Sequence, residues 1–170
     1  MTHIKIFSGS THPEFAKKIC SYLNVPLSNM IIKRFADSEV YVKSTDVVRG
    51  EDVFIVQPTS RPVNENLMEL LIMIDALQRS SVGQINVVIP YYGYSRQDRR
   101  ASAREPITAK LIANLLTAAG ADRIITVDLH SPQIVGFFEI NVDHFEAYPL
   151  FANYIAKKGL KEIVAVASDS

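Results

Sequence analysis

The chain has 170 residues, of which 48% are hydrophobic and 21% charged, and its 18 basic residues are balanced by 18 acidic ones. This length suffices for one domain or slightly more, and the composition is ordinary for a soluble globular protein. Because there is no net charge, we expect neither nucleic acid nor a membrane surface as a partner. A single cysteine, Cys20, excludes an internal disulfide, and its amphipathic helical context favours a buried structural thiol.

The N-terminus and the hydropathy of the chain indicate its compartment. Residues 4–7 have the pattern of a strand and not of a signal peptide, and no apolar run approaches the length of a membrane span. The single cysteine is compatible with a reducing compartment. We therefore expect a cytoplasmic protein.

Hydrophobic periodicity predicts an alternation of strands and helices. Short apolar runs predict strands at 3–8, 30–35, 40–42, 53–57, 85–90, 124–127 and 163–167. Amphipathic patterns with start and stop residues predict helices at 13–23, 64–80, 106–120 and 148–157. Residues 139–146 show neither pattern and are interpreted as a mixed connection. The alternation predicts an α/β fold in which a parallel sheet is flanked by helices.

Three predicted elements need a separate interpretation. No helix fits between the runs 30–35 and 40–42, so these are predicted to form a hairpin or flap. The helix 64–80 is apolar nearly all round, which indicates a helix that is sandwiched in the core or packed on another subunit. The strand 163–167 has no helix after it, so we predict a first domain at 1–146 and the start of an incomplete second one at 147–170.

A carboxylate and an imidazole follow the predicted strand 124–127. Asp128 and His130 are spaced i, i+2, so both side chains would leave the same face of the sheet if the extended geometry persists. Open α/β sheets bind ligands at the carboxyl ends of their parallel strands. A surface aspartate and an unrelated histidine at a strand end are the alternative interpretation of these residue types.

Arginines gather in the predicted loop 91–105. They are Arg96, Arg99, Arg100 and Arg104. The chain has no glycine-rich phosphate cradle of the P-loop or dinucleotide-binding kind, so phosphate contacts would come mainly from arginines and helix N-termini. Arginine suits phosphate through its bidentate fork, and Gln97 could bind an adenine edge. A solvated charged loop is the alternative.

The turn of the predicted hairpin places an aromatic ring beside two carboxylates. Phe35 could stack on a base while Asp37 and Glu39 accept hydrogen bonds from an exocyclic amine. The alternative, which the residue types by themselves favour, is an ordinary polar turn with one core aromatic.

Five segments together resemble the ribose-phosphate pyrophosphokinase family, also called phosphoribosyl pyrophosphate synthetases. They cover 34–42, 49–57, 66–74, 95–99 and 128–138, and the last of them reads DLHSPQIVGFF. The resemblance is collinear over essentially the whole chain, and this last string is highly specific. The chain departs from the family pattern at Asn141, where a proline is usual, and at Ala167-Ser168-Asp169, where Ser-Pro-Asp is usual.

The resemblance implies a fold of phosphoribosyltransferase-like α/β domains with a protruding hairpin. It also implies Mg²⁺-dependent transfer of diphosphate from ATP to O1 of ribose 5-phosphate, in an enzyme that self-associates to a dimer or hexamer. A non-catalytic regulatory or scaffold homologue is the alternative function, and the intact motifs favour descent from an active enzyme. A phosphoribosyltransferase is a third possibility, which the ATP-type hairpin disfavours.

The resemblance further implies roles for individual residues. The ATP-binding positions, of which the hairpin ones serve a neighbouring subunit, are Phe35, Asp37, Ser38, Glu39, Arg96 and Gln97. The metal positions are His130, Asp169, Asp128 and Asp143. The positions near a regulatory phosphate or ADP site between subunits are Arg49, Ser81 and Arg104.

The catalytic residues of the family have no counterpart in this chain. The family's catalytic loop, with its lysine and arginine, and its ribose 5-phosphate loop match nothing within 1–170, and the resemblance predicts both beyond Ser170. We therefore expect no catalytic residue in these 170 residues and no turnover by this chain alone.

Overall fold

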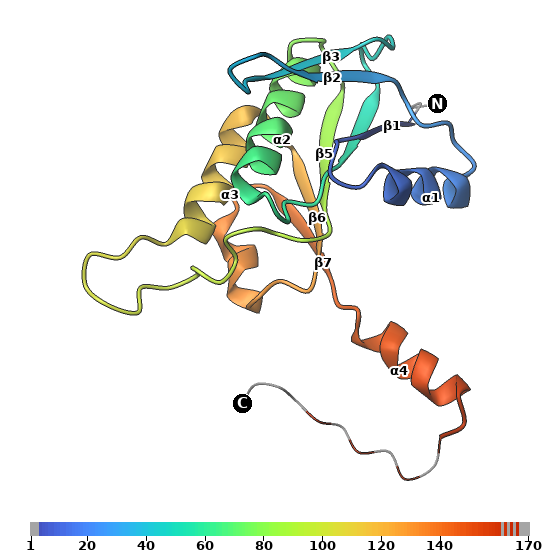
Figure 1. The fold of residues 1–170 in the computed structure, drawn as a ribbon, viewed down its shortest axis with the longest axis vertical. Helices are drawn as coiled ribbons and strands as arrows, with labels where there is room; N and C mark the ends of the chain where they lie inside the picture. Colours follow the sequence, from blue (N-terminus) through green and yellow to red (C-terminus); the bar gives the residue numbers. More distant parts are fainter. Residues whose placement is uncertain (1–3, 161, 163, 165, 167–170) are drawn as a thin grey trace.

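The structure, a computed structural model, describes residues 4–160, 162, 164 and 166 (Figure 1). Within these residues the centre is a five-stranded parallel sheet. Its strands, in spatial order, are β1 (Ile4–Ser8), β4 (Asp52–Val56), β5 (Gln84–Ile89), β6 (Arg123–Val127) and β7 (Asn141–Phe145). The α-helices are α1 (Pro13–Leu23), α2 (Val63–Gln78), α3 (Thr108–Ala119) and α4 (Tyr148–Lys157). The predicted parallel sheet flanked by helices is confirmed.

Helices cover both faces of the sheet, with α2 and α3 on one face and α1 on the other (Figure 1). Strand β4 shows why its sequence is apolar without alternation: Val53 and Ile55 pack toward α2, whereas Val56 packs toward α1. Leu70 and Ile74 of α2 are fully buried against this sheet. Burial of each such side chain contributes roughly 1.5–3 kcal/mol, so the α2 face is the main hydrophobic core.

The predicted hairpin is confirmed as the antiparallel pair β2 (Met30–Arg34) and β3 (Val40–Ser44). It is separate from the five-stranded sheet and packs against α2. Met30, Ile32 and Val42 are half-buried against the main core, whereas the residues of the turn are exposed. The hairpin therefore has an apolar base and a polar tip.

The prediction of a mixed connection at 139–146 is wrong, because β7 occupies Asn141–Phe145 and pairs in parallel with β6. β7 is an edge strand in which Val142, Asp143 and His144 are all half-buried. Its pairing partner β6 therefore decides its conformation, and no alternation of apolar and polar residues marks it in the sequence.

Three smaller outcomes concern helices. The predicted start of a helix at Pro106 is two residues early, because α3 begins at Thr108, and its end at Gly120 is confirmed by a left-handed cap with φ 113°. Cys20 is buried as predicted, and burial raises the pKa of its thiol. Among the described residues, no helix has the length and apolar character needed to span a membrane.

The last described segment is α4, which extends away from the sheet (Figure 1). It confirms the predicted helix at 148–157, and every residue in it is exposed. The predicted strand 163–167 falls mostly outside the described residues; of it only Val164 and Val166 are described, and both are exposed. The division into domains at 146 stays a prediction.

Candidate functional site

Two polar segments meet at the carboxyl edge of the sheet. The first is the arginine loop, residues 91–107, which follows β5. The second is the histidine turn, residues 128–131, which follows β6. Because β5 and β6 are neighbours in the parallel sheet, both segments start from the edge where such sheets bind ligands.

The backbone of the histidine turn differs from its predicted geometry. β6 ends at Val127, and Asp128 has φ 46°, in the left-handed region. The extended geometry on which the prediction of a shared face for Asp128 and His130 depends therefore does not persist beyond Val127. Aspartate tolerates this conformation better than most residues because its short side chain bonds locally.

Strand β7 and Ala147, the residue before α4, hold the histidine turn in place through three hydrogen bonds. The Asp128 N–H donates to the Phe145 carbonyl at 2.9 Å, and the Leu129 N–H donates to His144 Nε2 at 3.0 Å. The Ala147 N–H donates to Asp128 Oδ1 at 3.0 Å. One carboxylate oxygen of Asp128 is thus engaged at the β7–α4 junction, while the side chain of His130 remains exposed.

Asp98 joins the arginine loop to the segment after β6. Ser131 Oγ donates to Asp98 Oδ2 at 2.5 Å, and Gln133 Nε2 donates to the same oxygen at 2.9 Å. The hydrogen bond from Ser131 lowers the pKa of the Asp98 carboxyl, and the nearby charges of His130 and Arg99 act in the same direction. Sequence reasoning missed Asp98, although a lone acid inside a run of basic residues was a usable signal.

The arginine loop forms an open hollow beside the start of α2. Its lining residues are Val63, Tyr91, Tyr94, Ser95, Arg96 and Gln97. Arg96 and Gln97 are exposed. Thr108 Oγ1 donates to Gln97 Oε1 at 2.5 Å, so the amide oxygen is engaged at the start of α3. Gln97 can therefore offer its amide Nε2 to a ligand, as a donor.

The hairpin tip is a tight turn with an exposed aromatic ring. Phe35 is 57% exposed and meets Tyr41 edge-on at 6.0 Å between ring centroids. Ser38 has φ 75°, and Asp37 Oδ1 accepts from the Glu39 N–H at 3.1 Å. The alternative in which Phe35 is a core aromatic is wrong, because the ring lies outside the core.

The first turn of α2 anchors both the hairpin and the arginine loop. Arg34 of β2 forms an ion pair with Glu65 at 3.0 Å. Tyr94 OH donates to Asn64 Oδ1. Neighbouring residues of one helix end thus tie down two segments that carry predicted nucleotide contacts.

The predicted metal positions are not gathered into one cage of protein ligands. Asp143 lies within β7, where it pairs with Arg123 at 2.8 Å, and Asp128 and His130 lie in the histidine turn. In the described part of the chain, no group of three or more His, Cys, Asp or Glu side chains is arranged to hold a metal ion. A cation here would need ligands from elsewhere, such as phosphate oxygens.

The end of the chain carries two predictions that the structure does not test. The resemblance assigns Asp169 to the metal site and predicts the catalytic residues beyond Ser170. Both Asp169 and Ser170 lie outside the described residues. The fourth metal position and the location of the catalytic residues therefore stay predictions.

The predicted regulatory positions lie at two ends of the sheet. Arg49 and Ser81 are exposed near the amino ends of the strands, where the Gly50 N–H donates to the Ser81 carbonyl at 2.8 Å. Arg104 lies in the arginine loop at the carboxyl end. One subunit therefore does not bring the three together, and a shared phosphate would need a second subunit.

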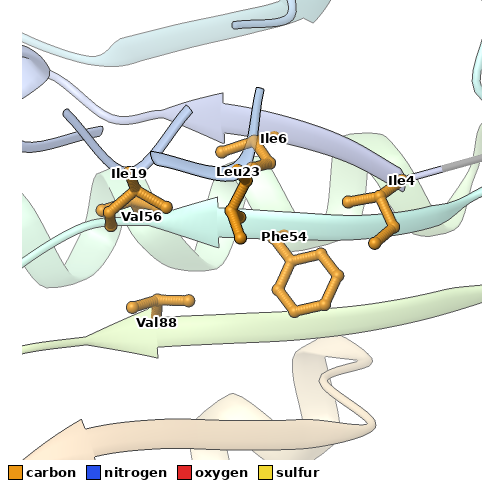
Figure 2. Close-up of a pocket in the computed structure, with 7 residues that line it drawn as sticks. All are labelled: Ile4, Ile6, Ile19, Leu23, Phe54, Val56 and Val88. Carbon is orange, nitrogen blue, oxygen red and sulfur yellow. The ribbon is translucent and has the colours of Figure 1, made fainter. Parts of the chain in front are cut away.

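A groove between α1 and the sheet is purely apolar (Figure 2). Its lining residues are Ile4, Ile6, Ile19, Leu23, Phe54, Val56 and Val88. No side chain there can bind phosphate or a cation. The carboxyl edge of the sheet is therefore the better candidate site.

Comparison with known proteins defines the family. The family model described as the N-terminal domain of ribose phosphate pyrophosphokinase matches residues 4–120. A ribose-phosphate pyrophosphokinase of Clostridium perfringens is 57% identical, over 98% of this chain and 53% of the relative. One of Fusobacterium nucleatum is 56% identical, over 98% of this chain and 54% of the relative.

A solved structure agrees with these sequence matches. The phosphoribosylpyrophosphate synthetase from Mycobacterium smegmatis superimposes with a TM-score of 0.90 at 45% identity, over 92% of this chain and 52% of that one. The chain belongs to the ribose-phosphate pyrophosphokinase family, as its motifs indicate. It spans about half the length of the curated relatives that it matches.

Proposed function

We propose that the chain is the ATP-binding half of a cytoplasmic enzyme that transfers diphosphate from ATP to ribose 5-phosphate, giving phosphoribosyl pyrophosphate and AMP. The observation that carries the proposal is 54–57% identity, over 98–99% of the chain, to proteins named ribose-phosphate pyrophosphokinase. The chain spans about half of each relative. We therefore assign ATP binding to this chain and ribose 5-phosphate binding to residues outside it.

The arginine loop supplies the positive charge that ATP phosphates need. Arg96, Arg99 and Arg100 are exposed, and within the described residues none of them forms an ion pair. Phosphoryl transfer depends mainly on positioning and charge neutralisation, so free guanidinium groups matter more here than a general base. Arg96 holds phosphate or ribose, and Gln97 orients the nucleotide through its amide Nε2.

The hairpin tip supplies the contacts to the base. Phe35 offers an exposed ring for stacking, and Asp37 and Glu39 offer carboxylate oxygens to an exocyclic amine. Ser38 has the left-handed conformation that shapes this turn. The tip serves the ATP site of a neighbouring subunit.

The histidine turn fits a divalent cation that is carried mainly by the nucleotide. Mg²⁺ usually keeps several waters and binds one or two protein groups together with substrate phosphates, which suits an exposed His130 beside Asp128. The resemblance adds Asp143 and Asp169 as acidic positions of the family's metal signature, although Asp143 is paired with Arg123 within β7. When bound, the cation supplies charge neutralisation on the transferred diphosphate.

Self-association completes the proposal, because the hairpin needs a neighbour. On α2, Met68 is 53% exposed although the opposite face of the helix is core. We expect at least a two-fold dimer, with a regulatory phosphate between Arg49 and Ser81 of one subunit and Arg104 of another. Light scattering that gives a clean monomer at high concentration would contradict this assembly.

Titration calorimetry with ATP and Mg²⁺ tests the nucleotide site. Arg96→Ala should weaken ATP binding by about 1.5–3 kcal/mol, the range for a lost hydrogen bond to a charged group. Arg79→Ala is the matched control, since Arg79 is an exposed arginine at the far end of α2, paired with Asp75. Unchanged affinity in Arg96→Ala would remove the arginine loop from the site.

An assay for AMP tests whether this chain binds ATP but lacks the site for ribose 5-phosphate. The 170-residue chain, incubated with ATP, Mg²⁺ and ribose 5-phosphate, should form no AMP that depends on the sugar phosphate. Without a bound second substrate the chain lacks the proximity term, worth roughly 7–11 kcal/mol in well-oriented systems. AMP in excess over the chain, formed only when ribose 5-phosphate is present, would show that both half-sites lie within these residues.

A further inference from the structure

The arginine loop and the histidine turn are joined by one carboxyl group. The Asp98 side chain lies inside the loop that carries Arg96 and Gln97, and it is 8% exposed although its neighbours Gln97 and Arg99 are exposed. It therefore points away from solvent and toward the segment after β6. Ser131, which donates to it at 2.5 Å, directly follows His130.

We propose that Asp98 is a positioning residue that sets the distance between the nucleotide side and the cation side of the site. This inference rests on the proposed function, in which Arg96 and Gln97 contact ATP and His130 contacts its cation. A single carboxylate oxygen, Oδ2, receives both Ser131 Oγ and Gln133 Nε2, so displacement of either segment breaks a hydrogen bond to a charged acceptor.

Backbone hydrogen bonds next to Asp98 and Ser131 connect the Asp98 contact to the start of α3 and to the 3₁₀ helix after the histidine turn. On one side, Gln97 precedes Asp98 and is itself held, because its carbonyl accepts from the Ala109 N–H at 3.1 Å. On the other, the Ser131 carbonyl accepts from the Ile134 N–H at 3.3 Å at the start of the 3₁₀ helix Pro132–Phe137. Movement of Asp98 would therefore disturb the start of α3 and the histidine turn together.

The test is the ratio of ATP dissociation constants measured without and with Mg²⁺. A residue that only stabilises the fold changes both constants by the same factor, whereas a residue that positions the cation side against the nucleotide side changes their ratio. Asp98→Ala should reduce the enhancement of ATP binding by Mg²⁺ by at least about fivefold, the lower end of typical coupling between sites. Asp98→Asn keeps an oxygen acceptor in a side chain of the same shape, so it should restore most of the enhancement of ATP binding by Mg²⁺.

Glu105→Ala is the matched control for loss of a carboxyl group from the same loop. Glu105 Oε2 accepts from the Ala101 and Ser102 N–H groups at 2.8 and 2.9 Å, so its removal loosens the tip of the arginine loop without touching the segment after β6. This variant should leave the ratio unchanged. An Asp98→Ala ratio equal to that of Glu105→Ala would overturn the inference.

Amide hydrogen exchange gives a second readout that needs no ATP. Asp98→Ala should speed exchange at both Ala109 and Ile134, whereas Glu105→Ala should speed it only at Ala101 and Ser102. If Asp98→Ala does not fold, Ser131→Ala is the second variant, because it removes the hydrogen bond between Ser131 and Asp98 from the opposite segment. It should also lower the ratio of the ATP dissociation constants without and with Mg²⁺. A wild-type ratio in Ser131→Ala would overturn the inference. Wild-type ATP affinity in Arg96→Ala would instead remove the arginine loop from the proposed ATP site, whatever ratio the Asp98 variants give.

Discussion

Two carboxyl groups hold loops at the carboxyl edge of the sheet, and they do so in different settings. Glu69 of α2 is 1% exposed and accepts three hydrogen bonds of 2.7–2.9 Å, from the Ser10 N–H, Ser10 Oγ and Gln57 Nε2. Asp98 is 8% exposed and accepts two, from Ser131 and from one further side chain. The first carboxyl group ties the β1–α1 loop to a core helix, whereas the second ties one surface loop to another.

The two settings predict different roles: the carboxyl group of Glu69 stabilises the fold, whereas that of Asp98 fixes the geometry of the candidate site. Gln57, which donates to Glu69, is fully buried, so loss of that carboxyl group leaves a donor unpaired inside the protein. Loss of Asp98 leaves donors on the half-buried Ser131 and the exposed Gln133, which lie at the surface where water can reach them. We therefore expect changes around Glu69 to alter the free energy of unfolding, and changes around Asp98 to alter ligand binding with little effect on stability.

The largest expected effect is that of Glu69→Ala. It should lower the free energy of unfolding by about 2–4 kcal/mol, because it combines a cavity in the core with unpaired donors. Urea denaturation measures this loss. Glu65→Ala is the matched control on the same helix; its ion pair with Arg34 is exposed, so its removal should cost less than about 1 kcal/mol. Equal losses in the two variants would break the comparison.

The next effect is that of Gly9→Ala, which tests how tightly the Glu69 cluster is packed. An added Cβ would lie 2.2 Å from Gln57 Oε1 and 2.4 Å from its Cδ, and Gln57 is itself held by Glu69. We expect a loss of about 1–3 kcal/mol, typical of an overpacked core. Gly136→Ala meets nothing within 4 Å and should be nearly neutral when both variants are compared by urea denaturation. A stable Gly9→Ala protein would mean that the cluster can shift.

A matched pair of serine substitutions sharpens the comparison further. Ser10→Ala removes a hydroxyl group that donates to Glu69 at 2.7 Å and should cost about 1–2 kcal/mol of stability. Ser131→Ala removes the equivalent donor to Asp98. It should cost less stability than Ser10→Ala and should instead weaken the enhancement of ATP binding by Mg²⁺. The reverse pattern in urea denaturation and calorimetry would contradict the assignment of roles.

The smallest effect is the pH dependence that Asp98 contributes. Its pKa is lower in the folded protein, mainly through the hydrogen bond from Ser131, so its contribution to stability is present above the unfolded value of about 3.9 and is lost as the pH falls below it. Urea midpoints of the wild type and Asp98→Asn should therefore begin to converge below about pH 5, roughly one unit above that value, and should meet once the pH lies below the lowered pKa of the folded state. In a Ser131→Ala background this convergence should be weaker. A difference that grows on acidification would show that the shift has the opposite sign.

Most of the scaffold follows from local pattern. The buried positions Leu70 and Ile74 recur with helical spacing, and the apolar run around Val53 and Ile55 is short and β-branched, so periodicity alone predicts α2 and β4. The hairpin follows from two strand patterns with no room for a helix between them. The family follows from the string after β6, because its residues are specific without reference to any contact.

The candidate site could be predicted only in part. Arg96 and His130 are marked by residue type and by their place after buried strands, and the structure puts both segments at one edge of the sheet. Asp98 was missed because its role depends on Ser131, which is 33 residues further along the chain. Glu69 was missed because its spacing on α2 is that of a core position, and its partner Ser10 is 59 residues away.

The sequence by itself determined the order of the strands and helices other than β7, the hairpin and the family, because periodicity and motif spacing act over short stretches of chain. Only the tertiary structure decided that β7 is a strand, since pairing with β6 compensates for its weak pattern. It likewise decided that Asp128 turns out of the extended conformation, held by β7 through Phe145 and by the adjoining Ala147. Hydrogen bonds between segments distant in the sequence impose these features, and no local preference of the chain encodes them.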